Sequence, residues 1–172
     1  MIRRLWAKIA LPAVQAASGP TAYGIRMNEP TKNIVILIAE DDPDDRLLAK
    51  EAFEESDMVS TLEFVEDGEE LLEYLHREDT PTPDLILLDL NMPRKDGREA
   101  LREIKHHPRF RHIPVVVLTT SNSEADIFPS YDLGASSYIT KPVTFEGFLN
   151  FMKALEKYWI EVVVLPSESM RE

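Results

Sequence analysis

The feature that most constrains the fold of this 172-residue chain is an alternation of short apolar runs with segments of helical period. The alternation occurs five times after Asn33, without internal sequence repeats. Short runs rich in aliphatic and β-branched side chains are typical of buried strands, and strands that alternate with helices favour a parallel sheet. The expected strands are residues 34–39, 61–65, 85–88, 115–119 and 137–140.

A helix-start signal follows each expected strand. Each signal places Asp, Ser or Thr before residue types common in a first helical turn. The five signals are Asp42-Pro43, Asp67-Gly68, Asp96-Gly97, Ser123-Glu124 and Thr144 with Glu146. Pro129 lies past the first turn of the fourth helix, where it should kink or end that helix. The last helix is expected from Phe145 to about Trp159, because its apolar residues recur at helical spacing.

These elements predict an α/β fold with a doubly wound, five-stranded parallel sheet and helices on both faces. Three strands are almost wholly apolar, as expected for a sheet covered on both faces. The chain length favours one domain, over residues 33–160. Residues 161–172 would form a C-terminal tail too short for a DNA-binding or catalytic output domain.

Residues 1–32 are expected to be an N-terminal extension. Arg3 and Arg4 precede an apolar, Ala-rich stretch that faintly resembles a secretory signal peptide, but Lys8 and Pro12 interrupt it. Met27 lies shortly before the first expected strand. Two interpretations stay open: a disordered tail, or an upstream segment that a start at Met27 would leave out.

Charge and composition exclude several classes of function. Residues 1–33 carry about +4, whereas the remainder carries 14 basic against 30 acidic residues, about −16. Such an acidic domain is a poor partner for duplex DNA or an anionic membrane. Cysteine is absent, which excludes disulfides and thiolate sites and fits a cytoplasmic location. No apolar run approaches the roughly 18 residues of a membrane-spanning helix, so no membrane insertion is expected.

Polar side chains gather where four of the expected strands end. In open parallel α/β sheets, ligands bind at the carboxyl ends of the strands. The residues at or after these ends are Glu40, Asp41, Asp42, Asp89, Asn91, Thr119 and Lys141. Several carboxylates in one crevice repel each other unless a cation or a protonated member accompanies them.

A hard divalent ion fits this set, because Mg²⁺ takes oxygen ligands and typically binds one or two carboxylates together with phosphate oxygens. Asp41 and Asp89 are candidate ligands. Lys141 could hold one phosphoryl oxygen and the hydroxyl of Thr119 another. With the charge neutralised, a carboxylate becomes a competent nucleophile toward a phosphoryl group.

The same motifs resemble those of bacterial response-regulator receivers over about residues 33–160. They are the segments 36–42 and 87–93, the Asp96-Gly97 turn, Thr119 and Lys141-Pro142, in the order and spacing of that family. The resemblance implies the flavodoxin-like strand order 2-1-3-4-5. It also implies a single-domain response regulator of a two-component phosphorelay, a signalling protein whose only catalysis is its own phosphotransfer and dephosphorylation.

The resemblance further implies which residues build the site. Asp89 is the implied phospho-acceptor. The implied ligands of Mg²⁺, or of Mn²⁺ in its place, are Asp41, Asp89 and the backbone carbonyl of Asn91. Glu40 is implied to be an acidic neighbour that acts through metal-bound water.

Three further residues receive implied roles. Thr119 and Lys141 are implied to contact the phosphoryl group, and Thr119 and Tyr138 to form the conformational switch. The Lys141-Pro142 bond is implied to be cis, which an X-Pro bond allows physically. A half-buried core or edge aromatic is the plainer interpretation of Tyr138.

Within the family, three features look like those of stand-alone regulators of cyanobacterial-type phytochrome kinases. They are Asp44-Asp45-Arg46, the segment 127–141, and Tyr158-Trp159 with Leu165-Pro166. The implied partner is a sensor histidine kinase, of phytochrome type. The resemblance also implies a homodimer through the face built from the fourth helix, fifth strand and fifth helix. The acidic charge of the domain, with the short C-terminal tail, predicts no direct DNA binding. Pro129 leaves the geometry of that dimer open.

Three other classes of protein compete with this interpretation. A haloacid-dehalogenase-like phosphatase needs a second acid two residues after its nucleophile, where this chain has Asn91. A nucleotide or flavin module would have a Gly- or Ser-rich phosphate loop after the first strand, where this chain has acids. A degenerate receiver is disfavoured because Asp89, Thr119 and Lys141 are all present. His106 and His107 are interpreted as helix-end residues rather than ligands.

Overall fold

A computed structural model of the chain describes residues 34–55, 60–155, 157–159, 163 and 165. The expected N-terminal extension over residues 1–32 and most of the expected C-terminal tail lie outside the described residues. The boundaries of the domain at residues 33 and 160 therefore stay predictions. Among the described residues, no helix is both long and apolar enough to span a bilayer.

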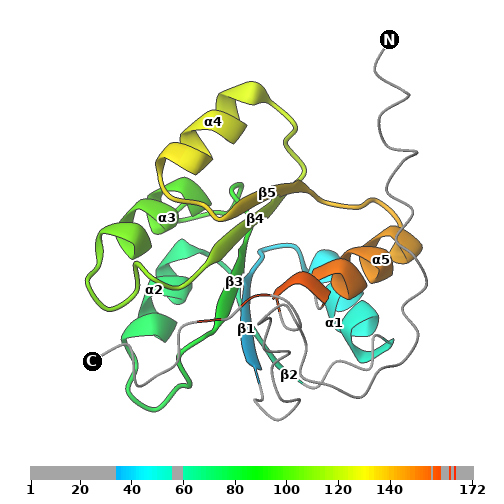
Figure 1. Cartoon of the computed structure of the whole chain (residues 1–172), viewed down its shortest axis with the longest axis horizontal. Helices are drawn as coiled ribbons and strands as arrows, with labels where there is room; N and C mark the ends of the chain where they lie inside the picture. Colours follow the sequence, from blue (N-terminus) through cyan, green and yellow to red (C-terminus); the bar gives the residue numbers. More distant parts are fainter. Residues whose placement is uncertain (1–33, 56–59, 156, 160–162, 164, 166–172) are drawn as a thin grey trace, which may run out of the picture.

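Five strands and five helices alternate along the described residues (Figure 1). The strands are β1 (Ile34–Ala39), β2 (Ser60–Val65), β3 (Leu85–Leu88), β4 (Val115–Thr119) and β5 (Ser137–Thr140). The helices are α1 (Pro43–Glu55), α2 (Gly68–His76), α3 (Gly97–His106), α4 (Glu124–Asp132) and α5 (Phe145–Leu155). The predicted alternation is confirmed, with β2 starting one residue earlier than expected.

The five strands form one sheet in the order β2-β1-β3-β4-β5, and every neighbouring pair is parallel. The predicted flavodoxin-like order is therefore confirmed. Figure 1 shows α2, α3 and α4 on one side of this sheet and α1 and α5 on the other. The order reverses between β1 and β3, which is where this kind of sheet opens a crevice for ligands.

Two apolar cores lie on the two faces of the sheet. Successive strand side chains point to opposite faces, so β1 sends Leu37 and Ala39 into the core with α2 and α3, and Ile36 and Ile38 into the core with α1 and α5. Leu37 and Ile36 are fully buried. The central strands are therefore held from both sides, and their carboxyl ends are fixed relative to one another.

The predicted helix starts are confirmed by their capping bonds. Asp42 Oδ1 accepts from the backbone N–H of Asp44 at 2.8 Å, and Asp67 Oδ1 accepts from that of Glu69 at 2.6 Å. Equivalent bonds begin the other helices; their acceptors are Asp96, Ser123 and Thr144. Each bond satisfies a backbone donor that the first helical turn leaves free.

Three local expectations need correction or refinement. The described residues contain no cis peptide bond, so the cis assignment of Lys141-Pro142 is wrong here; trans is the more stable X-Pro form by about 0.5–1 kcal/mol. Helix α4 does not stop at Pro129 but runs on to Asp132. Helix α5 is α-helical only to Leu155, and residues 157–159 form a π-helical turn in which Trp159 packs against the core of α1 and α5.

Candidate functional site

The carboxyl edge of the sheet brings together four polar side chains from four strand ends. Glu40 follows β1, Asp89 follows β3, Thr119 ends β4 and Lys141 follows β5. All four residues are buried, with exposed fractions of 4%, 5%, 0% and 8%. Buried polar groups are costly unless they are paired, so their partners determine what this edge can do.

Three carboxylates form a compact group at this edge. Oxygen atoms of Glu40, Asp41 and Asp89 all lie within 4.8 Å of one another. Burial raises the pKa of Glu40 to about 7; its hydrogen bond to Lys141 opposes this rise, and the charge of Asp89 adds to it. Three carboxylate oxygens at this spacing match the donor set that hard divalent cations prefer.

The ammonium of Lys141 bridges the acids. Its Nζ lies 2.6 Å from Asp89 Oδ2, 2.5 Å from Glu40 Oε2 and 2.9 Å from Asp45 Oδ2. Burial lowers the pKa of Lys141, but the hydrogen bonds that its ammonium donates to Asp89 and Glu40 outweigh that effect and hold the pKa above its usual value. Lys141 is therefore a permanent cation in contact with the predicted acceptor.

The loop after β3 fixes Asp89 from the other side. Asp89 Oδ1 accepts from the backbone N–H of Asn91 at 3.1 Å, and the backbone N–H of Asp89 donates to the carbonyl oxygen of Ala39 at 3.0 Å. The loop then folds back, and the N–H of Gly97 donates to Leu90 O at 3.0 Å. A Cβ at Gly97 would overlap the carbonyl oxygen of Asp89, so only glycine fits here.

Thr119 lies between the predicted acceptor loop and the segment before α4. Its Oγ1 accepts from Asn91 Nδ2 at 3.3 Å and from the backbone N–H of Ser121 at 3.5 Å. The hydroxyl of Tyr138 donates to the carbonyl oxygen of Ser121 at 2.9 Å, while its ring packs against the core of α2 and α3. Tyr138 is thus half-buried, and its contacts agree with both interpretations of this residue.

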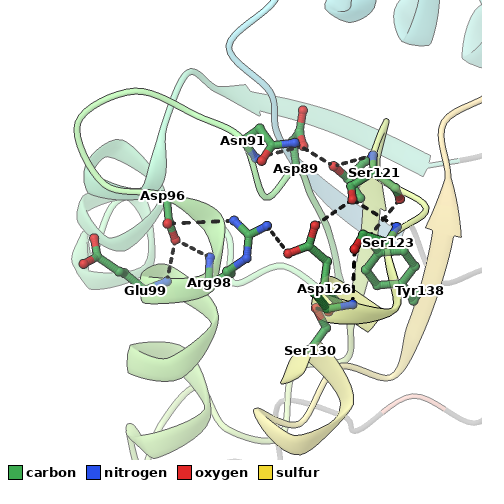
Figure 2. Close-up of polar contacts among 12 residues, drawn as sticks. Asp89, Asn91, Asp96, Arg98, Glu99, Ser121, Ser123, Asp126, Ser130 and Tyr138 are labelled. Atoms are coloured by element: carbon green, nitrogen blue, oxygen red, sulfur yellow. Dashed lines mark hydrogen bonds and ion pairs between the residues drawn. The ribbon is translucent and has the colours of Figure 1, made fainter. Parts of the chain in front are cut away.

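A polar network continues from Ser121 to α3 and α4 (Figure 2). Asp126 of α4 accepts from Ser121 Oγ at 2.6 Å and from Arg98 Nη2 of α3 at 2.5 Å. The bond from Ser121, followed by the bond from Arg98, holds the pKa of Asp126 below its usual value. Figure 2 shows the side chains of Arg98 and Asp126 pointing toward each other between the two helices, with Ser121 beside Asp126.

Sequence reasoning missed the contacts of Asp45, Arg98 and Asp126. Each residue lies in the first turn of a helix. Acids are common there, so no local pattern distinguishes Asp45 or Asp126, and the sequence around Arg98 does not indicate its distant partner. The spacing of Arg98 and Asp126, 28 residues apart, becomes informative only once α3 and α4 are placed on the same face.

The histidines show no sign of a metal site. His76 Nδ1 lies 2.7 Å from Leu72 O, and His106 Nδ1 lies 2.7 Å from Arg102 O, each one helical turn back. His107 stacks on Phe110 with ring centroids 4.2 Å apart. In the part of the chain that the structure describes, no group of three potential metal ligands includes a histidine.

The family model for the response regulator receiver domain matches residues 36–162, which include every residue of the site. The chain belongs to the response regulator receiver family. Receivers act in two-component phosphorelays, in which a histidine kinase is the partner, and this chain therefore functions in phosphorylation-dependent signalling.

Individual receivers are similar over nearly their whole length. The response regulator Rcp1 of Synechocystis sp. is 42% identical over 137 residues, which cover 77% of this chain and 93% of Rcp1. A crystal structure of the Mn²⁺-bound form of Rcp1 covers 78% of this chain and 99% of that one, with a TM-score of 0.72 and 41% identity. A crystal structure of the phosphorylated cyanobacterial phytochrome response regulator RcpA has a TM-score of 0.75 and 44% identity, covering 79% of this chain and all of RcpA.

Proposed function

We propose that Asp89 is the phospho-acceptor of this receiver and that a sensor histidine kinase of phytochrome type is the donor. The contact between buried Lys141 and both Asp89 and Glu40 carries the assignment, because it places a fixed cation on the acceptor carboxylate. The similarity to Rcp1 and RcpA supports the phytochrome-type kinase. A cytoplasmic location and the absence of direct DNA binding stay predictions.

The residues at the sheet edge fit a divalent ion. Asp41 and Asp89 would hold Mg²⁺ or Mn²⁺, with the backbone carbonyl of Asn91 as a further ligand and Glu40 acting through a bound water. The Mn²⁺-bound structure of Rcp1 supports this choice of metal. When bound, the ion supplies positive charge that offsets the repulsion between the carboxylates and the phosphoryl oxygens.

In the proposed transfer, a carboxylate oxygen of Asp89 forms a bond to phosphorus as the bond from phosphorus to the imidazole nitrogen of the donor phosphohistidine breaks. The imidazole leaves with the electron pair of that bond. Lys141 holds one phosphoryl oxygen through its ammonium, and Thr119 donates its hydroxyl to another. Lys141 already contacts Asp89, whereas the hydroxyl of Thr119 turns from its contacts with Asn91 and Ser121 to reach the phosphoryl group.

The signal is proposed to leave the site through Thr119 and Tyr138. When Thr119 turns its hydroxyl to the phosphoryl group, its contacts to Asn91 and Ser121 change, and Ser121 carries the bonds to Tyr138 and to α4. This shifts the population of two arrangements of the α4-β5-α5 surface. Phe128 and Tyr131 of that surface are exposed by 72% and 49%, which supports a homodimer through it.

The assignment is tested by incubating the protein with Mg²⁺ and acetyl phosphate and locating any added phosphoryl group by mass spectrometry. We expect one group, on Asp89, and none on the Asp89→Asn variant. Asp132→Asn is the matched control, since Asp132 is exposed at the end of α4. Incorporation that persists in Asp89→Asn would refute the assignment, and a wild-type protein that stays unmodified would favour a degenerate receiver.

A further inference from the structure

Asp45 contacts the lysine of the site without belonging to the group of acids that could hold a metal. Lys141 has three carboxylate partners, which are Glu40, Asp89 and Asp45. The group of acids with metal-ligand spacing consists of Glu40, Asp41 and Asp89. Asp45 is thus the partner of Lys141 that would keep its contact to the ammonium when a metal binds to the other acids.

The ammonium of Lys141 has one N–H donor for each of its three carboxylate partners, so the loss of one partner matters. An ammonium has three N–H donors, and the three carboxylates of Glu40, Asp89 and Asp45 lie 2.5, 2.6 and 2.9 Å from it. In the proposed function, Asp89 becomes an acyl phosphate and Glu40 turns partly toward the metal. The contact between Lys141 and Asp45 is then the one that stays the same when the metal binds and Asp89 is phosphorylated.

The first turn of α1 places Asp45 firmly enough to act as an anchor. Arg46, its neighbour, donates from Nη1 to the carbonyl oxygens of Glu40 at 2.8 Å and Asp41 at 2.9 Å. Arg46 Nη2 also lies 3.0 Å from Glu66 Oε1, beyond the end of β2. The turn that carries Asp45 is therefore tied to the loop that carries the metal-binding acids, and its carboxylate reaches across to the end of β5.

Burial separates Asp45 from the other two acids on Lys141. The side chains of Glu40 and Asp89 are each 6% exposed, whereas that of Asp45 is 35% exposed. Asp45 therefore loses less hydration than the inner pair and lies at the rim of the site. Its carboxylate contacts the ammonium without adding a third buried carboxylate to Glu40 and Asp89.

We propose that Asp45 is a positioning residue, which keeps the ammonium of Lys141 aligned for the incoming phosphoryl group while Glu40 and Asp89 engage the metal and the phosphorus. The inference rests on the proposed function, because it needs Asp89 to be phosphorylated. It concerns the rate of phosphorylation and leaves the affinity for Mg²⁺ unchanged.

The test compares Asp45→Asn with wild-type protein in two measurements. The first is the affinity for Mg²⁺ alone, by calorimetric titration, and the second is the initial rate of phosphorylation by acetyl phosphate at saturating Mg²⁺. We expect the Mg²⁺ affinity to stay within about twofold and the rate to fall about 5- to 10-fold, since small misplacements of a reacting group can cost up to about 100-fold. Asp44→Asn, on the exposed side of the same turn, removes the same charge and should leave both values unchanged.

Several results would overturn the inference. A wild-type rate in Asp45→Asn would show that Lys141 needs no third carboxylate, and a faster rate would show that Asp45 competes with the phosphoryl group. A loss of Mg²⁺ affinity parallel to the loss of rate would mean that Asp45 only supports the loop of Glu40 and Asp41. If the wild-type protein itself takes up no phosphoryl group, the proposed function fails first.

Discussion

Helices α3 and α4 lie on the same face of the sheet but are held there by different forces. Helix α3 buries Ala100, Leu101 and Ile104 completely. Helix α4 has only Ser130 buried among its described residues, while its Phe128 is 72% exposed. One helix is therefore part of the apolar core, and the other lies against the protein largely through polar contacts.

The polar contacts of α4 converge on a few atoms. Asp126 accepts from Ser121 and from Arg98, and the backbone N–H of Tyr138 donates to Tyr131 Oη at 3.2 Å. Ser130 Oγ donates to the carbonyl oxygen of Asp126 at 2.7 Å, a bond within α4 itself. A hydrogen bond contributes about 0.5–1.5 kcal/mol net, whereas loss of a buried leucine side chain costs several times more. Helix α4 can thus change position at a free energy that would not move α3.

The comparison predicts the largest effect for truncation of the α3 core. Leu101→Ala should lower the free energy of unfolding by about 3 kcal/mol, because Leu101 is fully buried and its removal leaves a cavity. Urea denaturation followed by circular dichroism measures this change. Ile104→Val serves as the graded control and should cost only about 0.5–1.5 kcal/mol. A loss below about 1 kcal/mol for Leu101→Ala would mean that α3 is no more firmly packed than α4.

A smaller loss is expected for the polar tether of α4. Asp126→Asn should lower the free energy of unfolding at pH 7 by about 1–2 kcal/mol, since charge-assisted hydrogen bonds to Ser121 and Arg98 weaken. Asp132→Asn, an exposed acid at the end of the same helix, should change stability by less than about 0.5 kcal/mol.

The effect of Asp126 should also depend on pH. Its carboxyl has a lower pKa in the folded protein than the usual 3.8, so the folded state binds fewer protons than the unfolded chain over the interval between the two values. Its contribution is complete above that usual value and is lost as the pH falls through the folded pKa. Urea denaturation at pH about 3.5 should therefore show a smaller difference between wild type and Asp126→Asn than at pH 7. If wild type and Asp126→Asn differ in free energy of unfolding by the same amount at both pH values, the ion pair between Asp126 and Arg98 is not the source of that difference.

The contrast between α3 and α4 also explains what the sequence could predict. The five apolar runs and the caps at Asp42, Asp67 and Asp96 are local signals, and each was confirmed. Strand-end residues such as Asp89 and Lys141 were predicted to meet because parallel strands share one edge, and their contact follows from the sheet. Periodicity and strand order thus specify both the core and the inner part of the site.

Contacts that depend on the placement of a whole helix could not be predicted in the same way. Asp45 and Asp126 are ordinary first-turn acids in the sequence, and their partners Lys141 and Arg98 are distant along the chain. The isomer of the Lys141-Pro142 bond was wrongly predicted because the two forms differ by only about 0.5–1 kcal/mol, which local packing can reverse. A pattern of strands and helices therefore does not specify the isomer of an X-Pro bond or the polar pairs between residues far apart in the sequence.

Removal of the Tyr138 hydroxyl should have a smaller effect than removal of the Asp126 charge. Tyr138→Phe loses the bond to the carbonyl oxygen of Ser121 but keeps the ring in the core, so the free energy of unfolding should fall by about 0.5–1 kcal/mol. The proposed switch predicts in addition that the NMR shifts of α4 amides respond less to phosphorylation in this variant. A response equal to that of wild type would leave Tyr138 as a half-buried edge aromatic.

The smallest effect on stability is expected at Phe128, the most exposed apolar side chain of α4. Phe128→Ala should change the free energy of unfolding by less than about 0.5 kcal/mol, because the side chain is 72% exposed and its removal leaves no cavity. The same residue would be buried in a dimer formed through the α4-β5-α5 surface, where an aromatic side chain contributes strongly to binding. Sedimentation velocity of phosphorylated protein should therefore show a shift from dimer to monomer in Phe128→Ala. Lys50→Ala, an exposed change on α1 and outside that surface, should leave the distribution as in wild type. A stable dimer in Phe128→Ala would show that the weak packing of α4 and the dimer contact are unrelated. The contact between copies would then lie elsewhere, and the weak packing of α4 would serve only its movement.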